Sequence, residues 1–288
     1  MFFIKLLSRL PFSVLYAFSD FLFFASYHLV RYRRTLVRKN LQNSFPGKTI
    51  GEVKIIEKEF YKNLCDYSVE TLKLLTISRE ELSRRMTFIH PGFLEQFIDR
   101  NQSIIFLASH QFNWEWSLVS ASINFPMHID FVYQPVNNAF FDRITLLSRS
   151  RFGAYPIARD KVARELVKRK SILRGVAIVA DQYPGYQNDK KFPVHFLNQD
   201  TVFFMGANNV AVLTQYPAVY YSLKKVKRGF YEAHPHIVAH PPYTKTDTSV
   251  VENYVKLVEK VILENPAGWL WSHNRWKTRH LNESADID

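Results

Sequence analysis

The chain has 288 residues, which is enough to bury a large core as one extended domain or as one domain with an appendage. Hydrophobic residues make up 47% and aromatic residues 15% of the sequence, and this balance excludes a disordered chain. The single cysteine, Cys65, excludes an intramolecular disulfide and a cysteine-based zinc cluster, while the formal net charge of +12 indicates anionic partners: nucleic acid, lipid headgroups or an acidic carrier protein.

The N-terminal part of the chain contains an apolar segment, residues 11–30, whose one formal charge is Asp20. Its length approaches the roughly 20 residues of a membrane-spanning helix, and it lacks the small-residue cleavage site of a secretory signal. A basic cluster follows directly: Arg31, Arg33, Arg34, Arg38 and Lys39. We interpret residues 1–40 as a membrane-associated helix with a basic collar suited to anionic headgroups. The alternative is an aromatic helix packed on the domain, with the arginines in solvent.

Residues 41–288 show strand-like and helical patterns in alternation, without a repeat or an interdomain linker. Apolar spacing of three and four predicts a helix over 50–76, and a capped helix start follows at 78–81. Apolar runs predict strands at 104–108, 129–133, 175–180, 218–222 and 233–239, and helical patterns cover 114–123, 138–152, 161–173 and 248–263. This alternation predicts one α/β domain with a mixed central sheet flanked by helices.

His110 follows the strand predicted at 104–108, and Glu115 comes five positions later. Open α/β sheets place their chemistry at the carboxyl ends of strands. If Glu115 bends back, it can accept the Nδ1 proton of His110 and leave Nε2 free as a base. The spacing alone is a weak pattern.

Other polar residues follow the later strands. Asp181 and Gln182 come after the strand at 175–180, where the carboxylate can contact an acceptor, a cation or a loop amide, or can stabilise a turn. Arginine suits bidentate binding of phosphate or carboxylate, although most arginines are solvated surface groups. Four of them bracket the turn at 152–156: Arg143, Arg149, Arg151 and Arg159.

The C-terminal stretch 269–277 is dense in aromatic and cationic residues, including Arg275 and Trp276. It can stack a nucleotide, cradle a headgroup or serve as a packing element; packing with a partial role at the cleft is our interpretation. We predict no metal site, because the remaining histidines lack metal-ligand spacing. These are His90, His128, His234, His236 and His240.

Taken in order, these clusters resemble the lipid A late acyltransferases, within the wider glycerophosphate and lysophospholipid acyltransferase superfamily. The resemblance covers essentially the whole chain. It includes residues 32–34 and 40–46, the histidine and glutamate of the His-x4-Asp/Glu signature, the block 133–142, the strand and Asp-Gln block at 175–185, and the ending 271–277. One departure is Gln134, which stands where many members have an arginine.

The resemblance implies an acyltransferase that moves a fatty acyl chain from an acyl carrier protein thioester to a lipid acceptor, a lipid A precursor or related glycolipid. It implies a location at the cytoplasmic face of the bacterial inner membrane. The thioester is a co-substrate, and no cofactor is expected. His110 would be the general base, contributing on the order of 10²–10⁴ in rate, while Glu115 fixes its tautomer. Candidate substrate-binding residues are Asn113, Gln134, Arg149, Arg151, Arg159, Asp181, Gln182 and Arg275.

Two other functions stay open at this point. Gln134 keeps a lysophospholipid or an aminolipid as alternative acceptor, because an arginine that meets an acceptor phosphate would be missing. A non-catalytic membrane lipid-binding protein is the alternative outside the enzyme class. We expect no nucleic acid partner, because the chain lacks a recognisable nucleic-acid module and its N-terminus is apolar.

Overall fold

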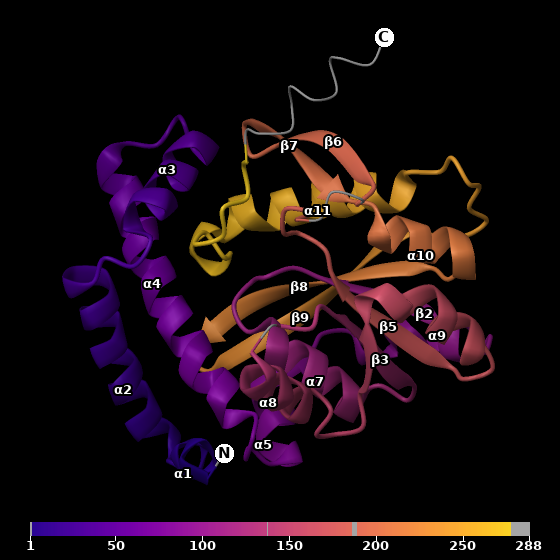
Figure 1. Cartoon of the computed structure of the whole chain (residues 1–288), viewed down its shortest axis with the longest axis horizontal. Coiled ribbons are helices and arrows are strands. Elements are labelled where there is room, and N and C mark those ends of the chain that lie inside the picture. Colours follow the sequence, from indigo (N-terminus) through magenta and orange to yellow (C-terminus); the bar gives the residue numbers. More distant parts are fainter. Residues whose placement is uncertain (1, 137, 186–188, 278–288) are drawn as a thin grey trace.

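A computed structural model of the chain describes residues 2–136, 138–185 and 189–277, and it has an α/β architecture (Figure 1). The central sheet has seven strands in the order β1-β9-β8-β2-β5-β3-β4. Neighbouring strands are parallel except for β8 and β9, so the predicted mixed sheet is confirmed. The strands are β1 (Met86–Phe88), β2 (Ile104–Ala108), β3 (His128–Tyr133), β4 (Tyr155–Ala158), β5 (Arg174–Val179), β8 (Ala218–Lys227) and β9 (Phe230–Ala239).

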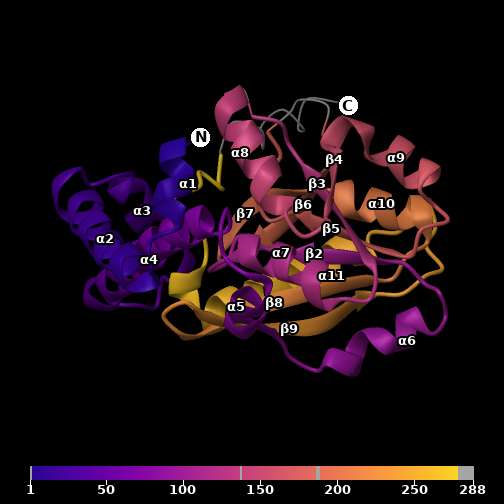
Figure 2. The same cartoon turned by 90° about the horizontal axis from the view of Figure 1, so that it is seen from below.

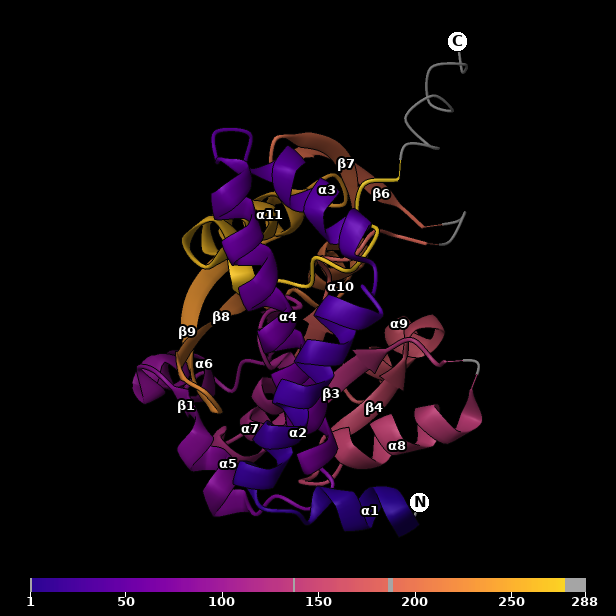
Figure 3. The same cartoon turned by 90° about the vertical axis from the view of Figure 1, so that its left-hand side faces the viewer.

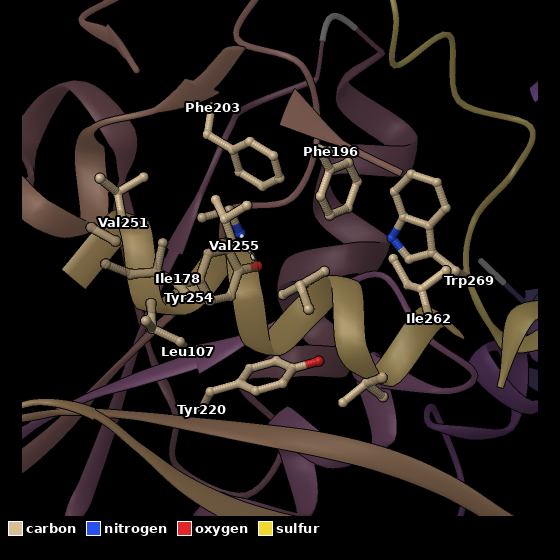
Figure 4. Packing of buried hydrophobic residues seen from close by; sticks show 14 of the residues in the cluster. Leu107, Ile178, Phe196, Phe203, Tyr220, Val251, Tyr254, Val255, Ile262 and Trp269 are labelled. Atoms are coloured by element: carbon tan, nitrogen blue, oxygen red, sulfur yellow. Dashed lines mark hydrogen bonds between the residues drawn. The ribbon is translucent and has the colours of Figure 1, made fainter. Parts of the chain in front are cut away.

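Helices cover both faces of this sheet, because its central strands are apolar on both sides. On one face, Phe106 and its neighbours pack against α7 (Trp114–Asn124) and α5 (Arg79–Arg85). On the other face, Leu107, Ile178 and Tyr220 lie beneath α11 (Ser249–Glu264), as Figure 4 shows. The remaining helices of the domain are α6 (Glu95–Ile98), α8 (Ala139–Arg149), α9 (Val162–Lys168) and α10 (Gly206–Thr214), with 3-10 turns at Pro91–Leu94, Arg159–Lys161 and Pro266–Gly268.

The N-terminal helices form a unit at one end of the molecule, opposite α9 and α10 (Figure 2). They are α1 (Phe2–Ser8), α2 (Phe12–Phe24) with a π-helical continuation at Ala25–Leu29, α3 (Arg34–Ser44) and α4 (Ile50–Lys73). Helix α2 runs along the outer side of α4 (Figures 1 and 3). Ser19 of α2 donates a 2.8 Å hydrogen bond to Asp66 of α4.

The outer side of α2 is apolar and faces away from the protein. Phe18, Phe21 and Phe24 are 51%, 62% and 53% exposed. Among the described residues, no single helix is long and apolar enough to cross a membrane, but the bent pair Phe12–Leu29 and Arg34–Ser44, at 85°, meets the criteria of length and composition together. The segment therefore packs on the domain with one side and exposes aromatic rings on the other.

Several elements were not predicted from the sequence. Strand β1 is only three residues long, and the hairpin of β6 (Lys191–Phe196) and β7 (Gln199–Phe204) carries Pro193 within β6. Two predicted helices are shorter than expected: 138–152 is helical over Ala139–Arg149, and 161–173 over Val162–Lys168. Short or polar elements give weak periodicity, so tertiary pairing decides their structure.

Candidate active site

His110 and Asp181 meet at the centre of the sheet. Strands β2 and β5 are parallel neighbours with Ala108 paired to Val179, so the residue two positions beyond each strand lies at the same edge. Asp181 Oδ1 lies 2.6 Å from His110 Nδ1, and Asp181 Oδ2 accepts the backbone N–H of His110 at 2.9 Å. Because a carboxylate only accepts, Nδ1 is the donor and Nε2 is left as the atom that takes a proton.

Asp181 is 1% exposed and is held in its ionised form by its donors. Burial raises the pKa of its carboxyl, but the nearby His110 and the bonds from His110 and Trp269 outweigh burial and hold the pKa below its ordinary value. Trp269 Nε1 donates to Asp181 Oδ2 at 2.7 Å. The His110 imidazole therefore contacts a fixed negative charge, and the His110 side chain is 17% exposed.

The expected contact between Glu115 and His110 Nδ1 is wrong, because Asp181 occupies that position. Asn113 caps the start of α7, so Glu115 lies in the first turn of the helix. Its carboxylate accepts from Arg149 Nε at 2.7 Å and Nη2 at 2.5 Å, and from Trp114 Nε1 at 3.2 Å. Burial raises the pKa of Glu115, but Arg149, His110 and Trp114 together outweigh burial and hold the pKa below its ordinary value, so the carboxylate is ionised. The catalytic role of Glu115 stays a prediction.

A cleft of about 270 Å³ opens beside the His110–Asp181 dyad, with His110 and Glu115 in its wall. It brings together three of the candidate substrate-binding residues, Gln134, Arg149 and Gln182. Apolar side chains of the sheet and of α7 contribute to the lining: Phe106, Phe131, Val132 and Ile178 from the strands and Leu118 from the helix. The cleft thus combines an oriented imidazole, a carboxylate–guanidinium pair and an apolar wall.

A larger cavity of about 740 Å³ adjoins this cleft, and both are lined by Val132, Gln134 and Ile178. Arg159 lines the larger cavity and forms an ion pair with Asp189. Its guanidinium also lies 4.4 Å from the ring centre of Phe204. The two cavities thus share one wall and leave extended space next to His110.

Four of the candidate substrate-binding residues line neither cavity: Asp181, which is bonded to His110, and Asn113, Arg151 and Arg275. The side chain of Arg151 donates to the carbonyls of Leu74 and Ile77, at the end of α4. Asn113 is fully buried behind the His110 loop. Arg275 is also fully buried, donates to Thr201 at 2.8 Å and lies 4.2 Å from the Phe203 ring centre, so it belongs to the core under the β6-β7 hairpin.

Other residues that support the loop had no recognisable signal in the sequence. Tyr220 bonds to Ser109 at 2.8 Å and donates to Gln111 at 3.0 Å, and Tyr254 donates to the carbonyl of Ala108 at 2.7 Å. Each comes from an element distant in the chain, and each looks like an ordinary core aromatic in sequence. Within residues 2–136, 138–185 and 189–277, no group of three or more His, Cys, Asp or Glu side chains could hold a metal ion.

Comparisons with known proteins agree over nearly the whole chain. A family model described as bacterial lipid A biosynthesis acyltransferase matches residues 1–278. The lipid A biosynthesis palmitoleoyltransferase of Escherichia coli (strain K12) is 23% identical over 259 residues, covering 88% of this chain and 81% of that protein. A lipid A biosynthesis acyltransferase of Shigella flexneri is similar to the same extent.

Proposed function

The chain belongs to the bacterial lipid A biosynthesis acyltransferase family, and we propose that it transfers a fatty acyl chain from an acyl carrier protein thioester to a hydroxyl of a lipid A precursor or related glycolipid. The observation that carries this proposal is the His110–Asp181 dyad at the wall of a cleft with an apolar lining. An oriented imidazole beside an acyl-sized cavity is what direct transfer to a hydroxyl requires.

His110 acts as general base in this mechanism. Nε2 takes the proton of the acceptor hydroxyl as its oxygen attacks the thioester carbonyl, so a C–O bond forms and a tetrahedral intermediate results. The intermediate then expels the thiolate by breaking the C–S bond, and the imidazolium returns its proton to that thiolate. Asp181 keeps the productive tautomer and stabilises the imidazolium between the two steps. No acyl-enzyme is needed; Cys65 lies on α4 and contacts Ser26.

Glu115 and Arg149 form the polar wall that would face the acceptor. The nearby His110 contributes to the lowered pKa of Glu115, and this electrostatic coupling supports the catalytic role predicted for Glu115. Arg149 lines this cleft, and Arg159 and Lys190 line the adjoining cavity. Of these cations, Arg149 and Arg159 are the arginines that could take the place of the one missing at Gln134. Arg149 is already paired with Glu115 and would meet an acceptor phosphate as part of that pair.

We place the enzyme at the cytoplasmic face of the inner membrane. The exposed aromatic side of α2 would lie in the lipid interface, and the basic residues after it would meet anionic headgroups. The net charge of +12 suits an acidic carrier protein as the donor.

A lysophospholipid or aminolipid acceptor is the second candidate, and the observation that favours it is Gln134 in the lining of both cavities. Purified enzyme in detergent would be given defined acyl carrier thioesters with either lipid A precursors or lysophospholipids, and products would be identified by mass spectrometry. We expect acylated lipid A precursor with the native chain and none with His110→Ala. Acylation of lysophospholipid alone would establish the second candidate, and transfer to no acceptor would contradict the enzymatic function.

A further inference from the structure

Glu70 of α4 is a fully buried carboxylate behind the loop that carries His110. Three neutral groups donate hydrogen bonds to it: Tyr16 Oη to Oε1 at 2.9 Å, Tyr231 Oη to Oε2 at 2.9 Å, and Asn113 Nδ2 to Oε2 at 2.8 Å. The donors come from α2, from β9 and from the loop itself. Glu70 is therefore a junction between the N-terminal helices, the sheet and the catalytic loop.

The side chain of Asn113 has only one productive orientation at this junction. Its Oδ1 accepts the backbone N–H of Trp116 at 2.9 Å and so caps α7, while its Nδ2 donates to Glu70. In its ionised form Glu70 only accepts, and the backbone N–H of Trp116 only donates, so turning the amide over would break both bonds. The backbone carbonyl of Glu70 also accepts Trp116 Nε1 at 2.9 Å, which ties the same helix start to α4 a second time.

The loop needs this support because its backbone is strained. Phe112, between His110 and Asn113, has φ of 43°, a left-handed conformation that non-glycine residues rarely adopt. Asp181 holds the loop from the side of the sheet, and Glu70 holds it from the side of α4. A displacement of about 1 Å at a reacting group can lower the rate about 10²-fold.

We propose that Glu70 is a positioning residue that, through Asn113, fixes the loop bearing His110, and that Tyr16 extends this connection to α2. The inference rests on the proposed role of His110 as the base. It links the predicted membrane segment to the catalytic loop by two consecutive hydrogen bonds, Tyr16 to Glu70 and Asn113 to Glu70. Burial in the absence of a bonded cation raises the pKa of Glu70 to about 7, although the three donors act against this. An apolar side chain at this position would avoid the free-energy cost of burying a carboxylate, yet the chain has Glu70 there.

Two isosteric substitutions test the proposal. Glu70→Gln exchanges one acceptor oxygen for an amide donor, so that Asn113 Nδ2 or a tyrosine hydroxyl loses its acceptor, and Asn113→Asp places a carboxylate against Glu70; each disrupts the junction. The double variant Glu70→Gln/Asn113→Asp restores it, because the new amide donates to the new carboxylate while the other oxygen still caps α7. We expect each single variant to lower kcat by about 10–100-fold with KM changed much less. The double variant should return to within about threefold of the native kcat.

Asp66→Asn is the matched control. Asp66 is also on α4, is 2% exposed and also accepts a bond from α2, but its partners are Ser19, Lys225 and Arg228 rather than the loop. We expect this variant to lower the melting temperature and leave kcat unchanged. Tyr16→Phe should lower kcat a few-fold without releasing the enzyme from vesicles of phosphatidylethanolamine and phosphatidylglycerol, because only the donor to Glu70 is lost.

A readout independent of turnover is the imidazole NMR signal of His110, assigned by its absence in His110→Ala. It should shift in each single variant and return in the double variant. The inference is overturned if the double variant stays as impaired as the single ones, or if Glu70→Gln alters kcat and the His110 signal no more than Asp66→Asn does. An inactive native enzyme with the expected pattern of NMR shifts would instead contradict the proposed function alone.

Discussion

At the scale of single residues, the structure differs from the sequence-based prediction mainly in the hydrogen-bond partner of His110 Nδ1. Glu115 is close to His110 in the chain, whereas Asp181 is 71 positions away and is the residue that touches Nδ1. The sequence correctly indicated that both His110 and Asp181 end strands. It could not indicate that those strands are neighbours, because strand order depends on tertiary pairing. The polar groups were therefore predictable, and their pairing was not.

Asp181→Asn should consequently be among the most damaging conservative substitutions. The amide can donate where Nδ1–H must be accepted, so the imidazole loses its productive tautomer and its counter-charge. We expect kcat to fall by about 10²–10⁴-fold, with the fold retained by circular dichroism. Glu115→Gln keeps the size of its side chain and should lower kcat less, because its charge acts on His110 without a hydrogen bond to it. A larger loss in Glu115→Gln than in Asp181→Asn would reverse this ranking.

The raised pKa of Glu70 predicts a pH dependence of stability. Below its ordinary pKa of 4.5 the carboxyl is protonated in both states and contributes no slope. As the pH rises towards the folded-state value of about 7, the unfolded chain releases the proton while the folded chain retains it, so folding stability falls across this window. The melting temperature should therefore fall less between pH 5 and pH 7 in Glu70→Gln than in the native chain, to the extent described by linkage. Equal slopes in the two proteins would contradict the raised pKa.

At the scale of elements, α2 combines two faces that the sequence suggested as alternatives. Leu15 is 2% exposed and, with Tyr16 and Ser19, belongs to the side packed on α4. The phenylalanines at 18, 21 and 24 belong to the outer side. Composition alone shows an apolar segment, and only the position of α4 decides which residues are buried. Truncation of residues 1–30 would remove both faces, so substitution of the outer face is the cleaner test of membrane binding.

Phe18→Ser/Phe21→Ser/Phe24→Ser should release the protein from vesicles of phosphatidylethanolamine and phosphatidylglycerol. Each buried phenylalanine stabilises lipid contact by about 1.5–3 kcal/mol, so three substitutions weaken partitioning by at least about 10³-fold. The fold should persist, because these side chains lie outside the core. Leu213→Ser is the control: Leu213 is 49% exposed on α10, at the opposite end of the molecule (Figure 2). Sedimentation of the triple variant with the vesicles would show that another surface anchors the protein.

At the scale of the whole molecule, the sequence predicted the fold class and the central strands, because buried parallel strands leave long apolar runs. It did not predict the β6-β7 hairpin, whose strands mix polar, apolar and aromatic residues without a clear period and close over Arg275. That packing explains why Arg275, a plausible phosphate ligand in sequence, lies inside the core. Composition likewise gives the total charge of the molecule but not the surface on which the charge is concentrated.

The positive charge that would attract an acidic donor lies, in part, beside the larger cavity. Helix α9 borders the larger cavity through Val162, and Arg164 and Lys168 on this helix are exposed. An acidic carrier protein that delivers its acyl chain to this cavity would meet them. We expect Arg164→Glu/Lys168→Glu to raise KM for the carrier thioester about tenfold and to leave KM for an uncharged pantetheine thioester unchanged. The effect should fade at 1 M salt, where the Debye length is about 3 Å.

Lys54→Glu/Lys58→Glu separates a local effect from the net charge of the molecule. It changes the total charge by the same amount, at two exposed positions on α4, away from the larger cavity. If only the total charge attracts the donor, both double variants raise KM equally, since long-range steering depends on the summed field. If the carrier docks beside α9, only the α9 variant raises KM for the carrier thioester at physiological salt, because exposed charges more than about 8 Å away are screened. An unchanged KM in the α9 variant would exclude that surface as the donor's docking site.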